Sequence, residues 1–454
     1  EILIGLVGSE MCIRDSFQSA EIYGGLNGCW DYGPMGVELK RNLKEYWWRK
    51  NVQEREDVVG MDGSILTHNS VLVASGHVGG FSDPMCDCLL TKERLRADQV
   101  PAQSGMGFFY TGAAKKDGSW NIEKKYSVLV ESEKQADKAR KTAAQYYAQL
   151  AGKDASYKDM ELKGECMETV TDSTMYNPAN GSLLTEAREF NLMFKTTIGA
   201  TSDENDPNAT GWLRPETAQS IFCQYKNILD SSRVKLPFGI AQIGKSFRNE
   251  INPRNFTFRS REFEQMEIEY FCRPEDGLRL VDEWLEHRLC FYDEVGVPRE
   301  HIHILDVPDG ERAFYSKKTY DLEYEFPFGI QELEGIAYRT DYDLSCHQKG
   351  SGRPLEYFDE ETREKFIPHV VEPSAGCDRT ILAIICEAYD EEELVDDKGK
   401  KDVRTVLRFV PRMAPIKAAI FPLLKKNGEQ VRIAREIELS LIHISEPTRP
   451  ISIS

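Results

Sequence analysis

Apolar residues recur with regular periods over much of the chain, and these patterns predict its main elements. In residues 34–50, apolar side chains recur three or four positions apart, which predicts an amphipathic helix that starts at Gly33-Pro34. Further patterns predict helices at residues 216–229, 277–295 and 379–389, and strands at residues 58–66, 237–250, 258–272, 320–327, 335–343 and 367–372. Short turns join neighbouring strands, so we expect an α+β fold with an antiparallel sheet flanked by helices, not a doubly wound parallel sheet.

The segments between these elements have a different character. Residues 76–84 are typical of a loop. Residues 97–186 hold a Lys-, Glu-, Gln- and Ala-rich stretch near 132–151, which predicts a helical insertion into the main fold. Residues 390–401 are a charged connector, and residues 414–424 predict a new apolar strand, so a domain boundary is expected near Pro411.

Both ends of the chain differ from its middle. Residues 1–16 and 438–454 show neither clean periodicity nor continuity with their neighbours, and they resemble translated sequencing-adaptor DNA. We interpret both segments as non-native. The expected division is therefore a main domain over residues 17–411 and the start of a second domain over residues 412–437.

Composition narrows the function classes. The 454 residues carry a formal charge of −18, which argues against a protein that coats nucleic acid non-specifically but allows one local basic patch. No apolar run approaches the ~20 residues that span a bilayer, and no leader is visible, so a cytoplasmic protein without a membrane partner is expected. Cys86 and Cys88 are the only close pair among 11 cysteines, and a structural zinc needs four ligands, so reduced thiols are favoured over zinc.

The most informative chemistry lies in residues 237–271. Alternation places Arg248 and Glu250 on one strand face, and Arg259, Phe263 and Glu267 share a face on the returning strand. Arginine forks match phosphate oxygens, an aromatic ring stacks on a base, and carboxylates accept from amino groups. The alternative from these residues alone is a solvent-exposed sheet with cross-strand ion pairs.

A second segment, residues 367–389, combines a strand, a glycine turn and a helix start. Backbone N–H groups at a helix N-terminus favour an anion. Arg379 in the first turn opposes the helix dipole, and a phosphate partner would explain it. The two segments together predict a site for a nucleotide.

These residues carry a specific resemblance. Residues 247–250 and 258–263 resemble motif 2 of class II aminoacyl-tRNA synthetases, residues 372–379 resemble motif 3, and the helix after Gly33-Pro34 resembles motif 1. Residues 21–36, 74–84, 214–219 and 262–270 are similar to the homodimeric glycyl-tRNA synthetases, and the likeness runs from about Phe17 to Ile437. It implies a class II catalytic domain over residues 17–411, a truncated α/β anticodon-binding domain from residue 412, and a glycine–tRNA ligase that forms glycyl-adenylate from ATP.

The resemblance also implies residue roles. Arg248, Glu250 and Arg379 would be catalytic, Arg248 on the α-phosphate, Glu250 on the adenine amino group and Arg379 on the γ-phosphate. The implied ATP-binding residues are Arg248, Asn249, Glu250, Phe258, Arg259, Ser260, Arg261, Glu262, Phe263, Glu332, Leu333, Gly376, Cys377, Asp378 and Arg379. The implied glycine-binding residues are Arg96, Glu216, Phe263, Glu264, Gln265, Met266, Glu267, Glu372, Pro373, Ser374, Ala375 and Gly376. Glu332 would hold Mg²⁺, the motif 1 helix would form a homodimer, and tRNA(Gly) would be the second substrate.

Two other functions stay open at this point. A class II-like ATP-dependent ligase or dinucleoside polyphosphate synthase would keep the fold without efficient tRNA charging. A non-catalytic paralogue would lose Arg248, Glu250 or Arg379, and all three are present. Because the remainder of the anticodon-binding domain is replaced by the final segment, we expect the chain to form glycyl-adenylate and to charge tRNA poorly.

Overall fold

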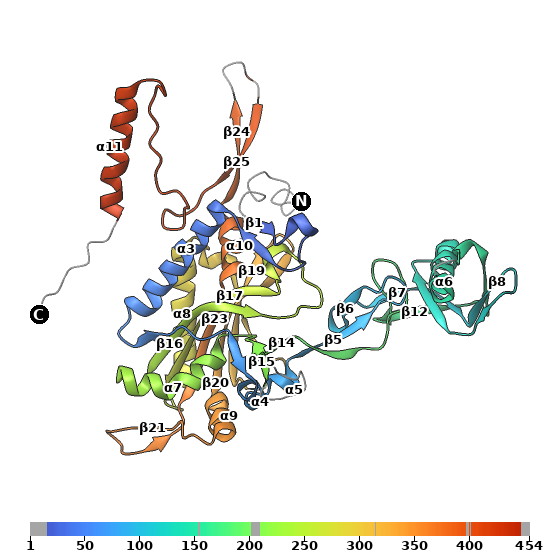
Figure 1. Ribbon diagram of the computed structural model, residues 1–454, viewed down its shortest axis with the longest axis horizontal. Coiled ribbons are helices and arrows are strands. Elements are labelled where there is room, and N and C mark those ends of the chain that lie inside the picture. Colours follow the sequence, from blue (N-terminus) through green and yellow to red (C-terminus); the bar gives the residue numbers. More distant parts are fainter. Residues whose placement is uncertain are drawn as a thin grey trace, which may run out of the picture.

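A seven-stranded sheet forms the centre of the computed structural model (Figure 1). Its strands lie in the order β18 (Ile302–Asp306), β19 (Lys318–Phe326), β20 (Gly329–Thr340), β23 (His369–Gly376), β17 (Glu262–Cys272), β16 (Phe238–Phe247) and β3 (Val58–Gly60). Neighbouring strands are antiparallel except β16 and β3, which run parallel. The antiparallel α+β fold expected from the sequence is confirmed.

Three helices cover one face of this sheet: α3 (Pro34–Trp48), α8 (Gly277–Val295) and α10 (Cys377–Ala388). Met266, Ile268 and Tyr270 of β17 pack against them in the largest apolar cluster. On the other face, α7 (Ala218–Ser232) and α9 (Tyr342–Ser351) bury Phe271 and other apolar residues at one end only. Because side chains alternate along a strand, the odd-numbered residues of β17 before Phe271 point to the face opposite α3, α8 and α10, in the part that α7 and α9 do not cover.

The helix expected near residues 132–151 is confirmed as α6 (Ala136–Ala151), but the inserted segment also contains strands, so it is an α+β unit and not a helical insertion. Its strands are β7 (Gln103–Tyr110), β8 (Gly112–Lys115), β9 (Asn121–Ile122), β10 (Tyr126–Val130), β11 (Met160–Lys163) and β12 (Cys166–Ser173). They form two three-stranded sheets, and α6 packs on them through Ala143 and Tyr147. The sequence reading followed the charged composition of α6 and missed the strands, two of which, β11 and β12, pair with strands about 45 to 70 residues earlier in the chain. The unit stands away from the central sheet (Figure 1).

The structure describes residues 16–445, apart from residues 153–154, 201–208, 314, 396–398 and 400. Residues 1–15 and 446–454 of the segments interpreted as non-native lie outside this range, and α11 runs unbroken past residue 438. The remaining strands are β1 (Ser16–Gln18), β2 (Trp30–Tyr32), β4 (Leu66–His68), β5 (Ser82–Asp87), β6 (Arg94–Arg96), β13 (Arg188–Asn191), β14 (Phe194–Thr197), β15 (Thr210–Leu213), β21 (Tyr357–Phe358), β22 (Lys365–Phe366), β24 (Tyr389–Val395) and β25 (Lys401–Leu407). The remaining α-helices are α4 (Asn69–Ala74), α5 (His77–Gly80) and α11 (Gly428–Ser445). One π-turn, Arg49–Gln53, extends α3, and short 3₁₀ turns lie at Glu21–Tyr23, Ala97–Gln99, Glu133–Gln135, Tyr157–Asp159, Phe256–Phe258 and Arg299–His301.

Two predictions near the N-terminal part were wrong. The strand expected over residues 58–66 is two strands, β3 and β4, in different sheets. Asp62-Gly63-Ser64 separates them, and this composition favours a turn that carries the chain out of the central sheet. The loop expected over residues 76–84 holds α5 and the start of β5, whose partner β13 lies about 100 residues away in the sequence.

Two predictions near the C-terminal part were also wrong. The charged connector of residues 390–401 belongs to a hairpin of β24 and β25, in which Glu392 pairs across the strands with Arg404 at 2.6 Å. Opposite charges facing each other stabilise such a pair of strands. The strand expected over residues 414–424 is not formed, since no neighbouring strand in the described residues satisfies its backbone.

No helix within the described residues has both the length and the apolar character needed to cross a membrane.

A buried ion pair ties α8 to the sheet. Arg288 Nε donates to Glu334 Oε1 at 2.6 Å, and each residue is 1% exposed. The substitution Arg288→Met leaves the Glu334 carboxylate buried without its partner and should lower the free energy of unfolding by about 3–5 kcal/mol. The double variant Arg288→Met with Glu334→Leu should recover most of this loss in a urea titration. A single variant as stable as the parent chain would contradict the assignment.

Candidate active site

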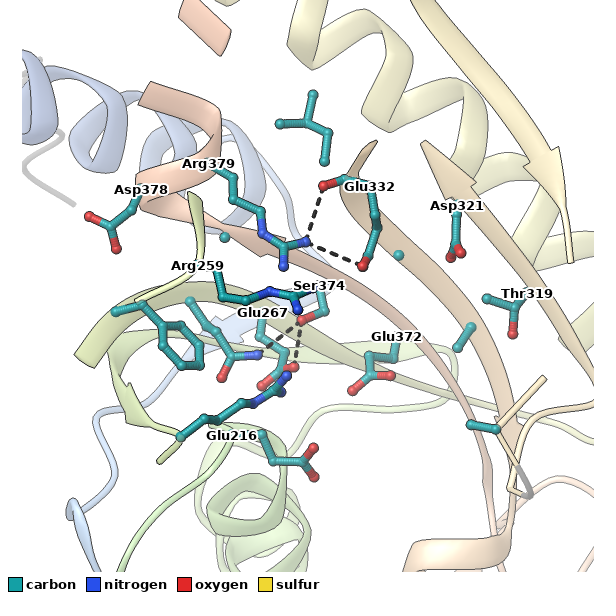
Figure 2. Close-up of a pocket in the computed structure, with 18 of the residues that line it drawn as sticks. Glu216, Arg259, Glu267, Thr319, Asp321, Glu332, Glu372, Ser374, Asp378 and Arg379 are labelled. Carbon is teal, nitrogen blue, oxygen red and sulfur yellow. Dashed lines mark hydrogen bonds and ion pairs between the residues drawn. The ribbon is translucent and has the colours of Figure 1, made fainter. Parts of the chain in front are cut away.

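A cavity of about 350 Å³ opens on the face of the central sheet that α3, α8 and α10 do not cover. Its walls come from β17, β20 and β23, from the loop before β17, and from the segment before β19. The predicted site residues that line it are Glu216, Arg248, Glu250, Phe258, Arg259, Ser260, Phe263, Glu264, Gln265, Glu267, Glu332, Leu333, Glu372, Ser374, Gly376, Asp378 and Arg379. Figure 2 shows Arg259, Arg379 and several carboxylates around the opening.

The other predicted site residues do not line the cavity: Arg96, Asn249, Arg261, Glu262, Met266, Pro373, Ala375 and Cys377. Strand alternation turns Met266 and Ala375 into the apolar cluster under α3 and α10. Arg261 donates to the backbone oxygens of Asn27 at 2.8 Å and Glu250 at 3.1 Å. Arg96 pairs with Asp83 at 2.9 Å.

Arg379 lies in the first turn of α10 and reaches over the cavity. Its Nη1 donates to the backbone oxygen of Glu332 at 3.1 Å and to Glu332 Oε2 at 3.2 Å (Figure 2). Its guanidinium carbon lies 4.4 Å from the ring centroid of Phe258. Its Nε donates to the backbone oxygen of Phe258 at 3.3 Å. Stacking, two backbone hydrogen bonds and one ion pair therefore hold this cation at the cavity wall, and the N–H groups of Nη2 are available to an anion.

Arg248 lines the same cavity. Its guanidinium lies between two rings, 5.2 Å from Phe81 and 5.4 Å from Phe263, and its Nε donates to Pro215 O at 3.1 Å. No carboxylate within the described residues forms an ion pair with Arg248. A guanidinium held by rings and a carbonyl keeps its charge for a ligand.

Asp378, next to Arg379, points away from the cavity (Figure 2). Its Oδ1 accepts from Tyr32 Oη at 2.7 Å and from Lys40 Nζ at 2.8 Å. Lys40 also pairs with Glu264 Oε2 at 2.8 Å. The carboxylates of Asp378 and Glu264 are thus engaged by α3, although both residues border the cavity.

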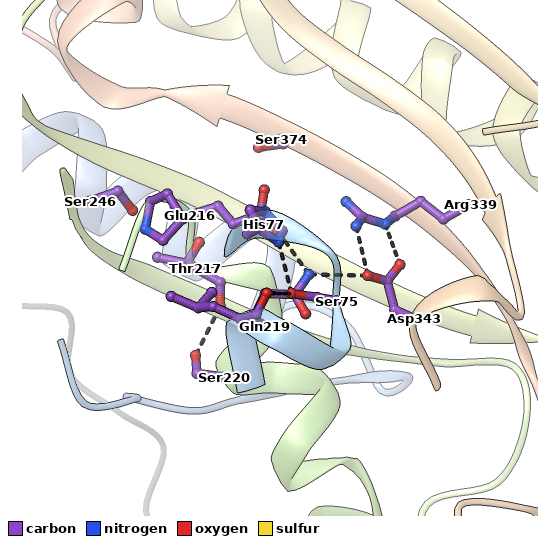
Figure 3. Close-up of polar contacts among 12 residues, drawn as sticks. Ser75, His77, Glu216, Thr217, Gln219, Ser220, Ser246, Arg339, Asp343 and Ser374 are labelled. Atoms are coloured by element: carbon purple, nitrogen blue, oxygen red, sulfur yellow. Dashed lines mark hydrogen bonds and ion pairs between the residues drawn. The ribbon is translucent and has the colours of Figure 1, made fainter. Parts of the chain in front are cut away.

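Carboxylates gather at the deep end of the cavity. Glu267 accepts hydrogen bonds from Thr217 Oγ1 and, at 2.7 Å, from Ser374 Oγ. Glu372 accepts from Arg339 Nη1 at 2.7 Å, and His77 Nε2 lies 3.3 Å from Glu216 (Figure 3). All three glutamates are at most 9% exposed. Such a concentration of buried negative charge favours a cationic ligand.

The comparisons with known proteins agree with this geometry. Residues 195–389 match the family model described as the tRNA synthetase class II core domain (G, H, P, S and T). The chain is 44% identical to the glycine–tRNA ligase of Rhodopirellula baltica, with 93% of this chain and 83% of that protein covered. It is 46% identical to that of Clostridium perfringens (91% and 79% covered) and 44% identical to that of Thermus thermophilus (94% and 80% covered).

The chain belongs to the glycine–tRNA ligase family. The resemblance to glycyl-tRNA synthetases described above is confirmed. In this member of the family, burial and nearby charges shift the pKa values of Glu216 and Glu372 in opposite directions. Burial would raise the pKa of Glu216, but His77 and then Arg339 outweigh burial and lower it well below its usual range. Burial, opposed by Arg339 and reinforced by Glu267 and Glu216, raises the pKa of Glu372 to about 8.

The sequence patterns did not identify several residues at or next to this site. Arg339 donates to Asp343 at 2.8 and 2.9 Å as well as to Glu372, and Gln219 Nε2 donates to Glu216 at 2.9 Å (Figure 3). Asp321 lies on the wall near Glu332. Alternation along residues 333–339 was the available signal, because it puts Arg339 on the same face as Leu333.

Cys86 and Cys88 were considered above as possible zinc ligands. Both lie buried in a small apolar cluster with Val100 and Leu184. The Cys86 Sγ donates to the backbone oxygen of Leu95 at 3.7 Å. Cys88 Sγ accepts from the backbone nitrogen of Thr91 at 3.5 Å. The two thiols therefore have different partners.

The Asp321 side chain makes the stability of the folded chain depend on pH. Burial, and then Glu332 and Glu323, raises the pKa of Asp321 from 3.8 to about 7. The folded chain holds a proton that the unfolded chain loses above its lower pKa, so this stabilisation is complete below about 3.8 and is lost as the pH rises through about 7. The thermal midpoint of the parent chain should therefore fall more between about pH 5 and pH 8 than that of Asp321→Asn.

The control for this measurement is Asp137→Asn, whose side chain is fully exposed on α6. It should follow the parent chain at both pH values. Equal slopes for the parent chain and Asp321→Asn would show that Asp321 titrates normally.

Proposed function

We propose that this chain activates glycine with ATP to glycyl-adenylate and transfers the glycyl group to the 3′ end of tRNA(Gly), a reaction of protein synthesis in the cytoplasm. One observation carries the proposal: a single cavity has arginines at its mouth and a carboxylate cluster at its deep end. Phosphates suit the first end and an α-ammonium suits the second. The carboxylate of glycine would then lie between them, beside the α-phosphate.

The arginine end suits the triphosphate. Arg248 would contact the α-phosphate and Arg379 the γ-phosphate, with Arg259 on the phosphate side. Arg259 has an Nη1 that reaches only Gln99 Oε1, at 3.5 Å, so its other N–H groups face the cavity. Phe263 beside Arg248 would stack on adenine, and the carboxylate of Glu250 would accept from the adenine amino group.

Residues on β19 and β20 fit Mg²⁺. A Cβ built on Gly335 would lie 3.7 Å from Asp321 Oδ1 and 3.8 Å from Glu332 Oε1, so glycine leaves the space between these carboxylates open. Mg²⁺ prefers one or two carboxylates together with phosphate oxygens. Glu332, with Asp321 beside it, would hold the ion, which would neutralise charge on the phosphates when bound. Glu332 would then release Arg379 to the γ-phosphate.

The carboxylate end suits glycine. Its ammonium would lie among Glu216, Glu267 and Glu372, with Ser374 Oγ fixed against Glu267. Glycine offers only an ammonium and a carboxylate, so a close wall around the α-carbon excludes larger amino acids by collision. Rejecting a larger competitor in this way needs no editing domain.

Chemistry at this site needs no side-chain nucleophile. The glycine carboxylate attacks the α-phosphorus and pyrophosphate leaves, and a ribose hydroxyl of the tRNA end then attacks the glycyl carbonyl and releases AMP. Arg248 lies where it would stabilise the charge that develops at the α-phosphate, so catalysis rests on positioning and electrostatics. We propose the loop of residues 252–256 for the tRNA end, since Thr257 and Phe258 after it line the cavity.

A second copy of the chain would cover an exposed apolar surface beside α3. Ile22 is 89% exposed, Tyr23 is 87% exposed and Leu26 is 54% exposed. Met35 and Val37 at the start of α3 are also exposed. Contiguous exposed apolar residues mark interaction sites, and a homodimer through α3 would bury them.

The amino-acid dependence of pyrophosphate exchange tests the proposal. Exchange should require glycine and stay at background with alanine or serine. Arg248→Ala and Arg379→Ala should each lower the rate about 10²-fold or more, because each removes a cation from the transition state. Arg404→Ala on the distant β24–β25 hairpin is the matched control and should retain the parent rate. A parent chain that exchanges without any amino acid would favour the dinucleoside polyphosphate synthase instead.

The substitution Glu216→Gln tests the proposed glycine end of the cavity separately from the ATP end. It keeps the size of the side chain and removes a buried charge, so the KM for glycine should rise about tenfold or more while the KM for ATP changes little. Both constants come from the same exchange assay. An equal rise in both would place Glu216 outside the ammonium site.

A further inference from the structure

Glu269 is the most unusual side chain near the site. It lies on β17, it is 0% exposed, and neither of its carboxylate oxygens has a hydrogen-bond partner among the described residues. Strand alternation places it on the same face as Glu267, yet it does not line the cavity. It lies two residues after Glu267 on β17, so both side chains are on the same face of the strand.

The strand register places a second carboxylate directly opposite Glu269. The pairs Glu267↔Ser374 and Tyr270↔Val371 between β17 and β23 put Glu269 across from Glu372 on the same face. Oxygens of Glu269, Glu372 and Glu267 all lie within 4.8 Å of one another. Two ionised carboxylates directly opposite each other on neighbouring strands repel.

Among the described residues no cation forms an ion pair with Glu269, and Arg339 opposes the repulsion only from a distance. Arg339 is the charged partner nearest to this group of acids, and its Nη1 is bonded to Glu372, while its Nε and Nη2 are bonded to Asp343. The charged groups that face Glu269 are Glu372 from β23, Arg339 from β20, Glu267 from β17 and Asp343 from α9. Three of these four are acids, so the surroundings oppose ionisation.

A buried carboxylate with neither a donor nor a cation is costly, and a proton removes most of that cost. Burial, and then Glu372, raises the pKa of Glu269 well above its usual range, which agrees with the geometry. A protonated carboxyl also gains an O–H donor, and the acceptors within reach are the oxygens of Glu372 and Glu267.

We propose that Glu269 is a neutral carboxylic acid that donates its proton to Glu372 as a hydrogen bond and so positions the Glu372 carboxylate for the ammonium of glycine. The inference rests on the proposed function. Arg339 holds one side of Glu372, and Glu269 holds the side toward β17. Glu269 is a positioning residue, since it acts through Glu372 and does not reach the cavity itself.

Two substitutions separate a neutral donor from a negative charge. Glu269→Gln keeps a neutral N–H donor of similar size, so glycine-dependent exchange should keep its KM for glycine within about threefold of the parent value. Glu269→Leu removes the donor, and the KM for glycine should rise about tenfold while the KM for ATP is unchanged. Glu216→Gln serves as the matched comparison, because there the charge itself is proposed to act.

Infrared spectroscopy gives a direct readout that does not depend on activity. The parent chain should show the carbonyl band of a protonated carboxylic acid at about pH 8, where ordinary glutamates are ionised. Glu269→Gln should show a weaker band, because Glu372, with a pKa of about 8, still contributes to it. This band tests the protonation state even if Glu269→Leu fails to fold.

Two outcomes would overturn the inference. A KM for glycine that rises equally in Glu269→Gln and Glu269→Leu would show that Glu269 acts through its charge. Absence of the carbonyl band from the parent chain would show that it is ionised. Failure of the proposed function looks different, since the parent chain itself would then show no glycine-dependent exchange.

Discussion

Strand β17 has to satisfy two opposed environments at once, and the rest of the structure depends on how it does so. Its even-numbered residues, among them Met266 and Ile268, are fully buried against the helices. The odd-numbered residues Gln265, Glu267 and Glu269 face the opposite way, toward the cavity or the space beneath it. Because side chains alternate, the apolar packing that fixes the strand also fixes the direction of the polar groups. A slip of one residue would exchange the two sets.

The polar face is costly to bury, and the surrounding elements supply its partners. Thr217 before α7 and Ser374 on β23 both donate to Glu267. Arg339 on β20 links Glu372 to Asp343 at the start of α9. Elements that are distant in sequence thus meet through hydrogen bonds to charged groups, which contribute more than neutral ones. The same network rigidly positions the carboxylates that we assign to the ammonium of glycine.

The arginines at the cavity mouth are held by contacts of a different kind. Arg379 and Arg248 are held by aromatic rings and carbonyl oxygens, and only Arg379 has a carboxylate partner, Glu332. Aromatic faces stabilise a guanidinium without neutralising it. The deep end of the cavity is therefore a closed network, while the mouth keeps uncompensated positive charge for an anionic ligand.

Sequence patterns predicted the central sheet and its covering helices, because these follow from alternation and helical periodicity along single segments. Most of the predicted residues that line the cavity came instead from the resemblance to class II synthetases, and strand alternation alone supplied Arg248, Glu250, Arg259, Phe263 and Glu267. Predictions failed where an element depends on a distant partner. The β5 strand pairs with β13, and the strand expected at residues 414–424 finds no partner strand in the part of the chain that the structure describes. Asp321 was missed because only the folded sheet brings β19 beside β20, whereas the alternation that puts Arg339 on the same face as Leu333 was present in the sequence. Alternation also explains why Met266 and Ala375, neighbours of true lining residues, face the core.

The central claim is that one cavity holds ATP and glycine together and joins them. It is tested most directly by incubating the chain with ATP and a single amino acid, separating the protein by gel filtration, and identifying the bound adenylate by mass spectrometry. Glycyl-adenylate should stay bound to the protein when glycine is supplied, and no adenylate should be found with alanine or serine. Retention of ATP alone, or an adenylate of another amino acid, would contradict it.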